Sequence, residues 1–281
     1  MRVVIPIAQK ELTIVNLTSR AKLWGCVFYP ADAEVDKKYP TIVFIPGGLG
    51  FGSAAARTPE PPMLARAGFV TGYFDPDGRG KSDGEENYNG KIHQDGLHAF
   101  LKLVVGLKFV DPNNLGVVSG SYGLALAAGA LGRYPNDPSV KYFIDIEGPS
   151  DRFYITKFDD PAFLRVFPHG TRDEEWWAER EAVRSIKHVC CAYLRIQHER
   201  DHAHGENKQH AIDMINAATH TKFGGHGMCP WTRINGTENE PNRTYTKDNP
   251  PKWLLAPVAP PPPAQMLHWV QEMSALPTNN T

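Results

Sequence analysis

The chain has 281 residues, of which 41% are hydrophobic and 22% charged, the composition of a globular protein with an ample core. A net charge of −1 and a pI of about 6.8 predict no basic surface that would bind nucleic acid or an anionic membrane. The sequence also contains no run of 18 apolar residues, the length that is needed to span a bilayer. We therefore expect a single domain over residues 1–281, with a small-molecule substrate and neither nucleic acid nor membrane as partner. The composition leaves the oligomeric state open.

The apolar run at residues 1–7 is shorter than a secretory signal and is soon followed by Lys10 and Glu11, so we expect a cytoplasmic protein. Four cysteines lack the spacing of zinc ligands, and we expect them to be reduced core residues.

Strand and helix patterns alternate along most of the chain. Antiparallel edge strands are expected first, then buried strands separated by helices, which is typical of a doubly wound, mostly parallel α/β sheet. The expected strands cover residues 2–7, 12–16, 23–29, 39–46, 69–74, 140–146, 190–197 and 230–235. The expected helices cover residues 62–67, 93–109, 207–219 and 264–275, and a proline-rich strap at 249–263 precedes the last.

One stretch combines a strand, a sharp turn and a helix. A β-branched run ends in Ser119-Gly120-Ser121-Tyr122-Gly123, and an Ala/Leu-rich run with helical spacing follows. Such a turn strains the backbone of its central residue, so the residues two positions before and after it must be small. Ser121 would project above the sheet, and the N–H of Tyr122 would be free to meet a developing negative charge.

This turn resembles the nucleophile elbow of the α/β-hydrolase superfamily, with Ser119 replacing the usual first glycine. Two further motifs stand in the order found in that family. A glycine-rich loop at residues 47–52 follows a buried strand, and the turn at residues 75–84 resembles the family's Asp-x-Arg-Gly-x-Gly-x-Ser turn. The resemblance covers roughly residues 40–220 and implies an α/β-hydrolase sheet, in which Asp77 and Arg79 pair to fix loops beneath the site.

The resemblance also implies roles for individual residues. Ser121 would be the nucleophile, and the N–H groups of Tyr122 and Gly48 would bind the oxyanion. Asp201, a few residues beyond the strand at 190–197, would be the acid of the triad, with Asp145 as the alternative one strand earlier.

Three histidines are candidates for the third member of the triad. In this superfamily it follows the acid, so His226, in a glycine-rich loop 25 residues beyond Asp201, is the best candidate by position. His220 and His202 are the alternatives. If residues 230–235 form the last strand, His226 precedes that strand, whereas the family's histidine follows it.

Residues 151–188 depart from the alternation of strands and helices and are rich in aromatic residues. The superfamily commonly inserts a cap at this point, so we expect a small helical cap. Trp176 and Trp177 would line the substrate pocket together with Phe51. The alternative is a surface helix whose aromatic side chains face the core.

The sequence therefore predicts a hydrolase that cleaves carboxylic esters through an acyl-enzyme on Ser121, with no cofactor and no metal. The alternatives are an amidase or peptidase of the same fold, or a binding protein that has lost the triad histidine. A metal site built from Asp201, His202, His204 and His210 has acceptable ligands but no recognised spacing.

Overall fold

A computed structural model describes residues 6–33, 37–219, 232–234, 237–238, 244–250 and 263–277 of the chain. His226 and most of the proline-rich strap lie outside these residues. The statements below concern the described part of the chain.

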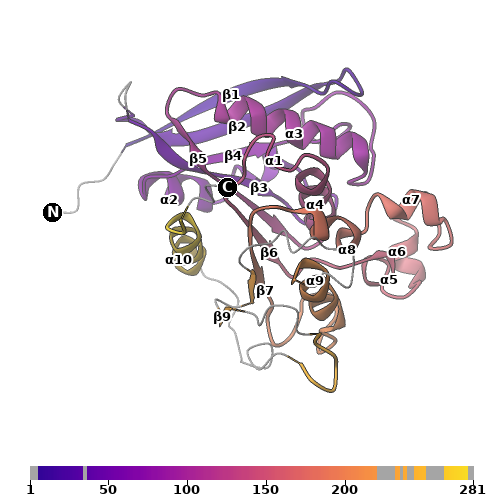
Figure 1. Ribbon diagram of the computed structural model, residues 1–281. Coiled ribbons are helices and arrows are strands. Elements are labelled where there is room, and N and C mark those ends of the chain that lie inside the picture. The colour runs from indigo at the N-terminus through magenta and orange to yellow at the C-terminus, as the bar shows by residue number, and fades with distance from the viewer. Residues whose placement is uncertain are drawn as a thin grey trace.

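A twisted nine-stranded sheet runs through the molecule in the order β1-β2-β4-β3-β5-β6-β7-β8-β9 (Figure 1). The strands from β4 to β8 are parallel to one another, whereas β1, β2 and β9 pair antiparallel at the two ends. The bounds are β1 Ile7–Val15, β2 Lys22–Pro30, β3 Tyr39–Ile45, β4 Val70–Phe74, β5 Val110–Gly120, β6 Tyr142–Ile146, β7 Ala192–Ile196, β8 Thr232–Ile234 and β9 Thr237–Glu238. The expected mostly parallel sheet is thus confirmed.

Helices cover both faces of the sheet, as the doubly wound architecture requires (Figure 1). Apolar residues of α3 (Lys91–Val105), α4 (Gly123–Arg133), α8 (Ala182–Ser185) and α9 (Gln209–Thr219) share one core with the sheet. On the opposite face, α2 (Glu60–Arg66) and α10 (Pro263–Ser274) contribute to a second core, in which Trp269 and Val270 of α10 pack against the central strands. Short α1 (Gly52–Ala55) follows the glycine-rich loop.

The segment between β6 and β7, residues 151–188, projects from one side of the sheet (Figure 1). It contains α5 (Arg152–Ile155), α6 (Pro161–Leu164), α7 (Glu174–Ala178), α8 and the 3₁₀-helix η1 (Ile186–His188). We call it the insertion. Asp151, Asp160 and Asp173 cap the starts of α5, α6 and α7, respectively, with their side chains.

An ion-pair network closes the insertion at its base. Arg152 contacts Glu181 at 2.5 Å and Glu174 at 2.7 Å, and Arg184 pairs with the same two glutamates. The N–H of Val183 also donates to the carbonyl oxygen of Ser150 at 3.0 Å. The two ends of the insertion therefore lie next to each other.

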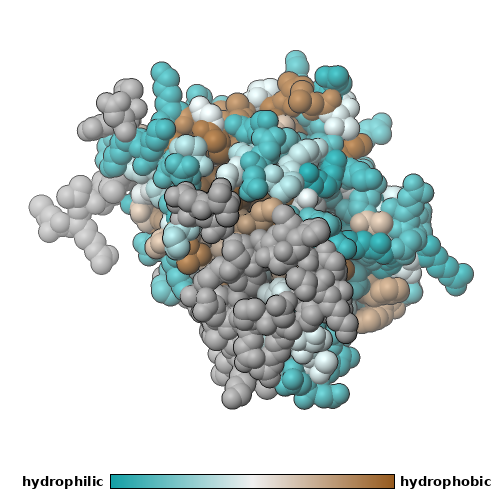
Figure 2. Space-filling view, in the orientation of Figure 1, coloured by the Kyte–Doolittle hydropathy of each residue, from teal (hydrophilic) through white to brown (hydrophobic). Residues whose placement is uncertain are grey.

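Hydrophilic residues cover most of the coloured surface in Figure 2, and hydrophobic residues form small separate areas in that view. Among the described residues, no helix combines the length and the apolarity that crossing a membrane requires. Cys26, Cys190 and Cys191 are free thiols, but Cys190 is only half-buried, whereas we expected it in the core.

Candidate active site

Ser121 stands at the sharp turn between β5 and α4, with a backbone φ of 46°. The surrounding residues are small for a visible steric reason. A Cβ added at Gly123 would lie 2.5 Å from the carbonyl oxygen of Pro46, and one added at Gly47 would lie 3.0 Å from Ser121 Cβ. The N–H of Ser121 donates to the carbonyl oxygen of Ile146 at 2.8 Å, which ties the turn to the end of β6. The expected elbow therefore forms, and it holds the Ser121 hydroxyl above the sheet.

His202 lies beside this hydroxyl, with its Nε2 atom 3.0 Å from Ser121 Oγ. Its other ring nitrogen, Nδ1, is 2.7 Å from Oε2 of Glu147. An ionised carboxylate can only accept, so Nδ1 must carry the proton, which leaves Nε2 free to accept the proton of Ser121. Serine, histidine and carboxylate thus form a continuous hydrogen-bonded chain.

Glu147 follows β6 directly and has a φ of 51°, a conformation that turns its side chain toward the end of β7. His198 Nδ1 lies 2.7 Å from Oε1 of the same carboxylate, and the His198 N–H also donates to Oε1, at 3.3 Å. The two oxygens are therefore divided between two histidines. This arrangement fixes the orientation of the carboxylate toward His202.

The charges of these groups are coupled. The hydrogen bond to Glu147 raises the pKa of His202 above its ordinary value, although partial burial acts in the opposite direction. Burial alone would raise the pKa of Glu147, but the hydrogen bonds from His202 and His198 lower it overall. Glu147 is thus ionised at neutral pH, and it favours the protonated form of His202 that proton transfer from Ser121 would create.

Asp201, the acid we expected from the sequence, is not the hydrogen-bonding partner of His202. Its Oδ1 lies 3.8 Å from His202 Nδ1 and accepts instead from the N–H groups of Ala203 and His204, at 2.7 and 2.8 Å. Oδ2 accepts from Gln197 Nε2 at 2.9 Å. The short aspartate side chain is thus occupied in shaping the turn that carries His202, and the longer Glu147 reaches the imidazole.

Asp145, the alternative acid, lies in β6 and is fully buried. It contacts Arg195 at 2.5 Å and accepts from Tyr193 Oη at 2.7 Å. It supports the strand ends and does not contact His202. His226 and His220 lie outside the described residues, so the prediction that His226 is the base stays a prediction. His202 is the histidine that the described structure brings to Ser121.

The glycine-rich loop borders the serine. Gly48 has a φ of 60°, and it lines the same cavity as Ser121 and Tyr122. Tyr122 is held at both ends, because its hydroxyl donates to the carbonyl oxygen of Tyr88 at 2.7 Å and its own carbonyl accepts from Asn89 Nδ2 at 2.9 Å. Both expected oxyanion donors thus lie at the cavity, and their role stays a prediction.

The prediction that Asp77 pairs with Arg79 is wrong. Arg79 forms a bidentate pair with Glu86, at 2.7 Å for each contact, and also donates to the carbonyl oxygen of Gly50 at 3.3 Å. Asp77 accepts instead from Asn16 and Ser19. The turn still fixes the glycine-rich loop, but through a partner seven residues away that presents both oxygens to the guanidinium.

A cavity of about 240 Å³ opens at Ser121. Its lining comes from the glycine-rich loop, the elbow, the turn after β6, residues 203–204 and the insertion. Most of the lining is apolar or aromatic, and the insertion contributes Tyr154, Ile155, Lys157, Phe163, Val166 and Phe167. The insertion thus lines the cavity at Ser121, and its role as a cap stays a prediction.

The three residues expected in the substrate pocket do not line this cavity. Trp177 is fully buried and packs against Tyr122 and Ile155, with its Nε1 donating to the carbonyl oxygen of Gly170 at 3.0 Å. Trp176 lies under the Arg180 guanidinium, 3.7 Å from its ring centroid. Phe51 packs against Gly80 of the neighbouring turn. The tryptophans hold the insertion together, because Trp177 is fully buried and the partly buried Trp176 packs against the same cluster.

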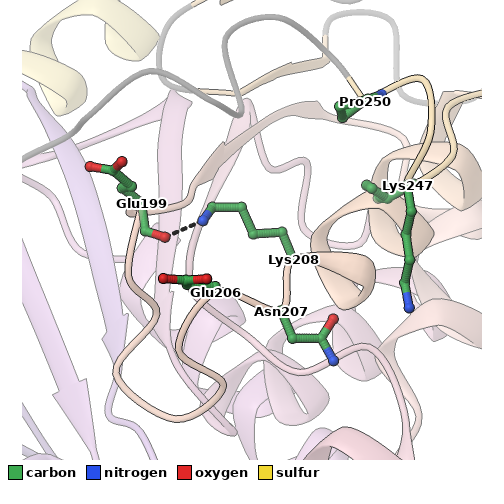
Figure 3. A pocket seen from close by; sticks show the side chains of 7 residues that line it. Glu199, Glu206, Asn207, Lys208, Lys247 and Pro250 are labelled. Atoms are coloured by element: carbon green, nitrogen blue, oxygen red, sulfur yellow. Dashed lines mark hydrogen bonds between the residues drawn. The ribbon is translucent and has the colours of Figure 1, made fainter.

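A larger hollow of about 560 Å³ lies elsewhere and shares no lining residue with the Ser121 cavity (Figure 3). Lys208 extends across it, and its ammonium donates to the carbonyl oxygen of Glu199 (Figure 3). Its lining is mostly charged or polar, and Ser121, Glu147 and His202 are not part of it. We therefore place the candidate site at the smaller cavity.

Glu147, Asp201 and His202 also present ligand atoms within 4.8 Å of one another, as a metal site would. However, the oxygens of Glu147 and Asp201 already accept hydrogen bonds from histidine, glutamine and backbone donors. A metal would have to displace these donors. The expected set with His204 and His210 does not converge: His210 Nε2 lies 3.4 Å from Asp201 Oδ2, but the described residues whose ligand atoms all lie together are Glu147, Asp201 and His202.

The sequence analysis did not single out Glu147, or Lys157 of the cavity lining, and it ranked His202 below His226. One signal could have revealed Glu147, since it directly follows a buried parallel strand, at the same sheet edge as the elbow. For Lys157, nothing in the local pattern distinguishes it from a surface lysine.

Comparisons with known proteins agree with this description. No family model matches the chain. A stretch of 144 residues, 47% of the chain, is 29% identical to an uncharacterized peptidase, YuxL, of Bacillus subtilis strain 168, and covers 22% of that protein.

Solved structures are similar over nearly the whole chain. Porphyromonas gingivalis dipeptidyl peptidase 4 matches 94% of the chain with a TM-score of 0.64 and 16% identity, and prolyl oligopeptidase B of Galerina marginata matches 95% with a TM-score of 0.65 and 13% identity. The acylaminoacyl peptidase of Pyrococcus horikoshii matches 84% with a TM-score of 0.59. The chain spans only 35%, 36% and 37% of these three structures. The sheet, the elbow and these similarities together show that the chain has the α/β-hydrolase fold.

Proposed function

We propose that the protein is a serine hydrolase that cleaves an amide or peptide bond through an acyl-enzyme on Ser121. The observation that carries the proposal is the hydrogen-bonded chain from Ser121 Oγ through His202 to Glu147, with distances of 3.0 and 2.7 Å. These lie within the range in which a general base can take a proton. The sequence alone favoured esters, but YuxL and the three similar structures carry the names of peptidases.

The reaction follows from the geometry. Ser121 Oγ attacks the acyl carbon while His202 Nε2 takes its proton, and Glu147 stabilises the imidazolium that forms. The N–H groups of Tyr122 and Gly48 bind the developing oxyanion. The imidazolium then protonates the leaving amine as the C–N bond breaks. Water, deprotonated by His202, attacks the acyl carbon and releases the acid and Ser121.

Covalent labelling tests the nucleophile and the base together. A fluorophosphonate should label Ser121 in the wild type, should not label Ser121→Ala, and should label His202→Ala slowly. His226→Ala is the matched control and should label at the wild-type rate. Labelling lost in His226→Ala but kept in His202→Ala would refute His202 as the base and restore the assignment made from the sequence.

Matched substrates test the bond that is cleaved. Short peptidyl p-nitroanilides and benzyl esters with the same acyl group should both be hydrolysed, and both activities should disappear in Ser121→Ala. Hydrolysis of the esters with no hydrolysis of the anilides would refute the peptidase assignment and favour an esterase. A folded wild type with neither labelling nor turnover would favour a binding protein.

A further inference from the structure

Lys157 is a cationic residue in a largely apolar cavity. It lines the cavity at Ser121, and its ammonium lies 4.2 Å from the ring centroid of Phe163, which lines the same cavity. Its side chain is half-buried. The insertion therefore brings a positive charge to the cavity that opens at Ser121.

No carboxylate of the described residues forms an ion pair with Lys157. Asp159, the nearest acid in the sequence, accepts instead from Thr171 Oγ1 at 2.5 Å. Glu147, the acid that lines the cavity, is held by His198 and His202. Because Lys157 is only partly exposed to water and has no ion-pair partner among the described carboxylates, the cavity offers an attractive position for an anion.

The backbone around Lys157 is strained in a way that fixes this position. Lys157, Phe158 and Asp159 have φ values of 50°, 59° and 66°, although none of them is glycine. Each such residue costs about 1 kcal/mol. Two hydrogen bonds hold the turn, from the Phe158 N–H to Phe153 at 2.6 Å and from the Asp160 N–H to Thr156 at 3.0 Å. The turn leaves Phe158 exposed and Lys157 at the cavity.

The neighbouring histidine does not compete for the anion. Burial lowers the pKa of His204 to about 4, and the Lys157 ammonium acts in the same direction. His204 is thus neutral at pH 7, and Lys157 provides the positive charge in the cavity lining. The hydrogen bond with Glu147 raises the pKa of His202, and the Lys157 ammonium acts weakly in the opposite direction. The ammonium therefore also lies near the catalytic groups.

We propose that Lys157 binds a carboxylate of the substrate, so that the hydrolase prefers acyl compounds that carry a negative charge close to the bond cleaved. This inference rests on the proposed function, because it names the substrate class of the same site. The carboxylate has two possible sources. It belongs either to an acidic side chain of the acyl residue or to the free carboxyl end of a one-residue leaving group.

Isosteric substrate pairs distinguish these sources. N-acetylglutamyl and N-acetylglutaminyl p-nitroanilide differ only in the charge of the acyl side chain. N-acetylalanylglycine and its C-terminal amide differ only in the charge of the leaving group. We expect kcat/KM to be at least about tenfold higher for the charged member of one pair, the effect of one charge-assisted hydrogen bond.

Lys157→Met should abolish this preference, whereas Lys157→Arg should keep most of it. Lys108→Met is the matched control, because Lys108 is exposed between α3 and β5. Equal kcat/KM values within both pairs in the wild type would overturn the proposal. A preference that survives in Lys157→Met would also overturn it.

A binding measurement separates this proposal from the proposed function. In Ser121→Ala, calorimetry should show that glutaramate binds at least about tenfold more tightly than the uncharged glutaramide. The difference should vanish in the Ser121→Ala/Lys157→Met double variant. If the wild type turns over no substrate but this difference is found, the hydrolase assignment fails and the carboxylate site stands. Equal binding of the two compounds refutes the carboxylate site whether or not turnover occurs.

Discussion

Replacing Glu147 by glutamine removes one acceptor from a carboxylate that serves three donors. Oε1 accepts from Nδ1 and the N–H of His198, and Oε2 accepts from His202. The single amide oxygen should stay with the two donors of His198, which turns the amide NH₂ toward His202 Nδ1. His202 must then accept at Nδ1 and carry its proton on Nε2, facing Ser121.

In that tautomer His202 cannot take the serine proton. The loss in kcat/KM should be about 10³–10⁴-fold, or roughly 4–5.5 kcal/mol of transition-state stabilisation, as in triads whose acid is replaced by an amide. The unfolding free energy should change much less, because the amide keeps the packing and at least two of the hydrogen bonds.

Asp201→Asn should instead lower the unfolding free energy while changing kcat/KM little. Burial alone would raise the pKa of Asp201, but contacts with His210 and Gln197 hold it well below the usual range. The carboxylate therefore stabilises the folded state at neutral pH, and its loss should cost about 2 kcal/mol. The difference from wild type should shrink as the pH falls below about 4, because there the unfolded chain binds a proton on Asp201 that the folded carboxylate still lacks.

The assay combines steady-state kinetics, normalised to folded protein, with urea denaturation. Glu206→Gln is the control, since Glu206 is an exposed glutamate in the larger hollow. If Glu147→Gln stays within tenfold of wild type while folded Asp201→Asn loses about 10³-fold, the assignment of Glu147 is refuted and Asp201 orients the base.

Three further outcomes are expected. The kcat/KM of the wild type should rise with pH as neutral His202 forms, with an apparent pKa above the ordinary 6.5, and a profile centred below 6.5 would contradict the role of Glu147. Trp177→Ala should lower the unfolding free energy by about 3–5 kcal/mol, measured in urea, with unchanged substrate preference, because the ring is fully buried. EDTA should leave activity unchanged within about twofold if His202 is the base, whereas loss that Zn²⁺ restores would favour a metal at Glu147, Asp201 and His202.

Local patterns predicted most of the fold. The buried strands were recognised because they are continuous β-branched runs, and the elbow because its turn admits only small neighbours. Ser121 and the glycine-rich loop could be located for the same reason. Their geometry depends on residues within a few positions of one another.

The remainder of the candidate site depends on distances that no local pattern encodes. Glu147 and Asp201 both follow parallel strands that lie side by side, so the sequence offers two acids at one sheet edge. Side-chain length and the left-handed backbone of Glu147 decide which one reaches His202. The tryptophans were misjudged because an aromatic-rich insertion needs a core of its own, and Trp177 supplies it.

The ion pairs at the base of the insertion have a consequence for how this fold can vary. Since Arg152 and Glu181 pair across the two ends of the excursion formed by residues 153–180, its contour length can change without altering the spacing of β6 and β7. The excursion is thus an exchangeable module, and we expect it to open as one cooperative unit in hydrogen exchange. The ends of the strands would then carry the catalytic residues, and the module would determine which substrates reach them.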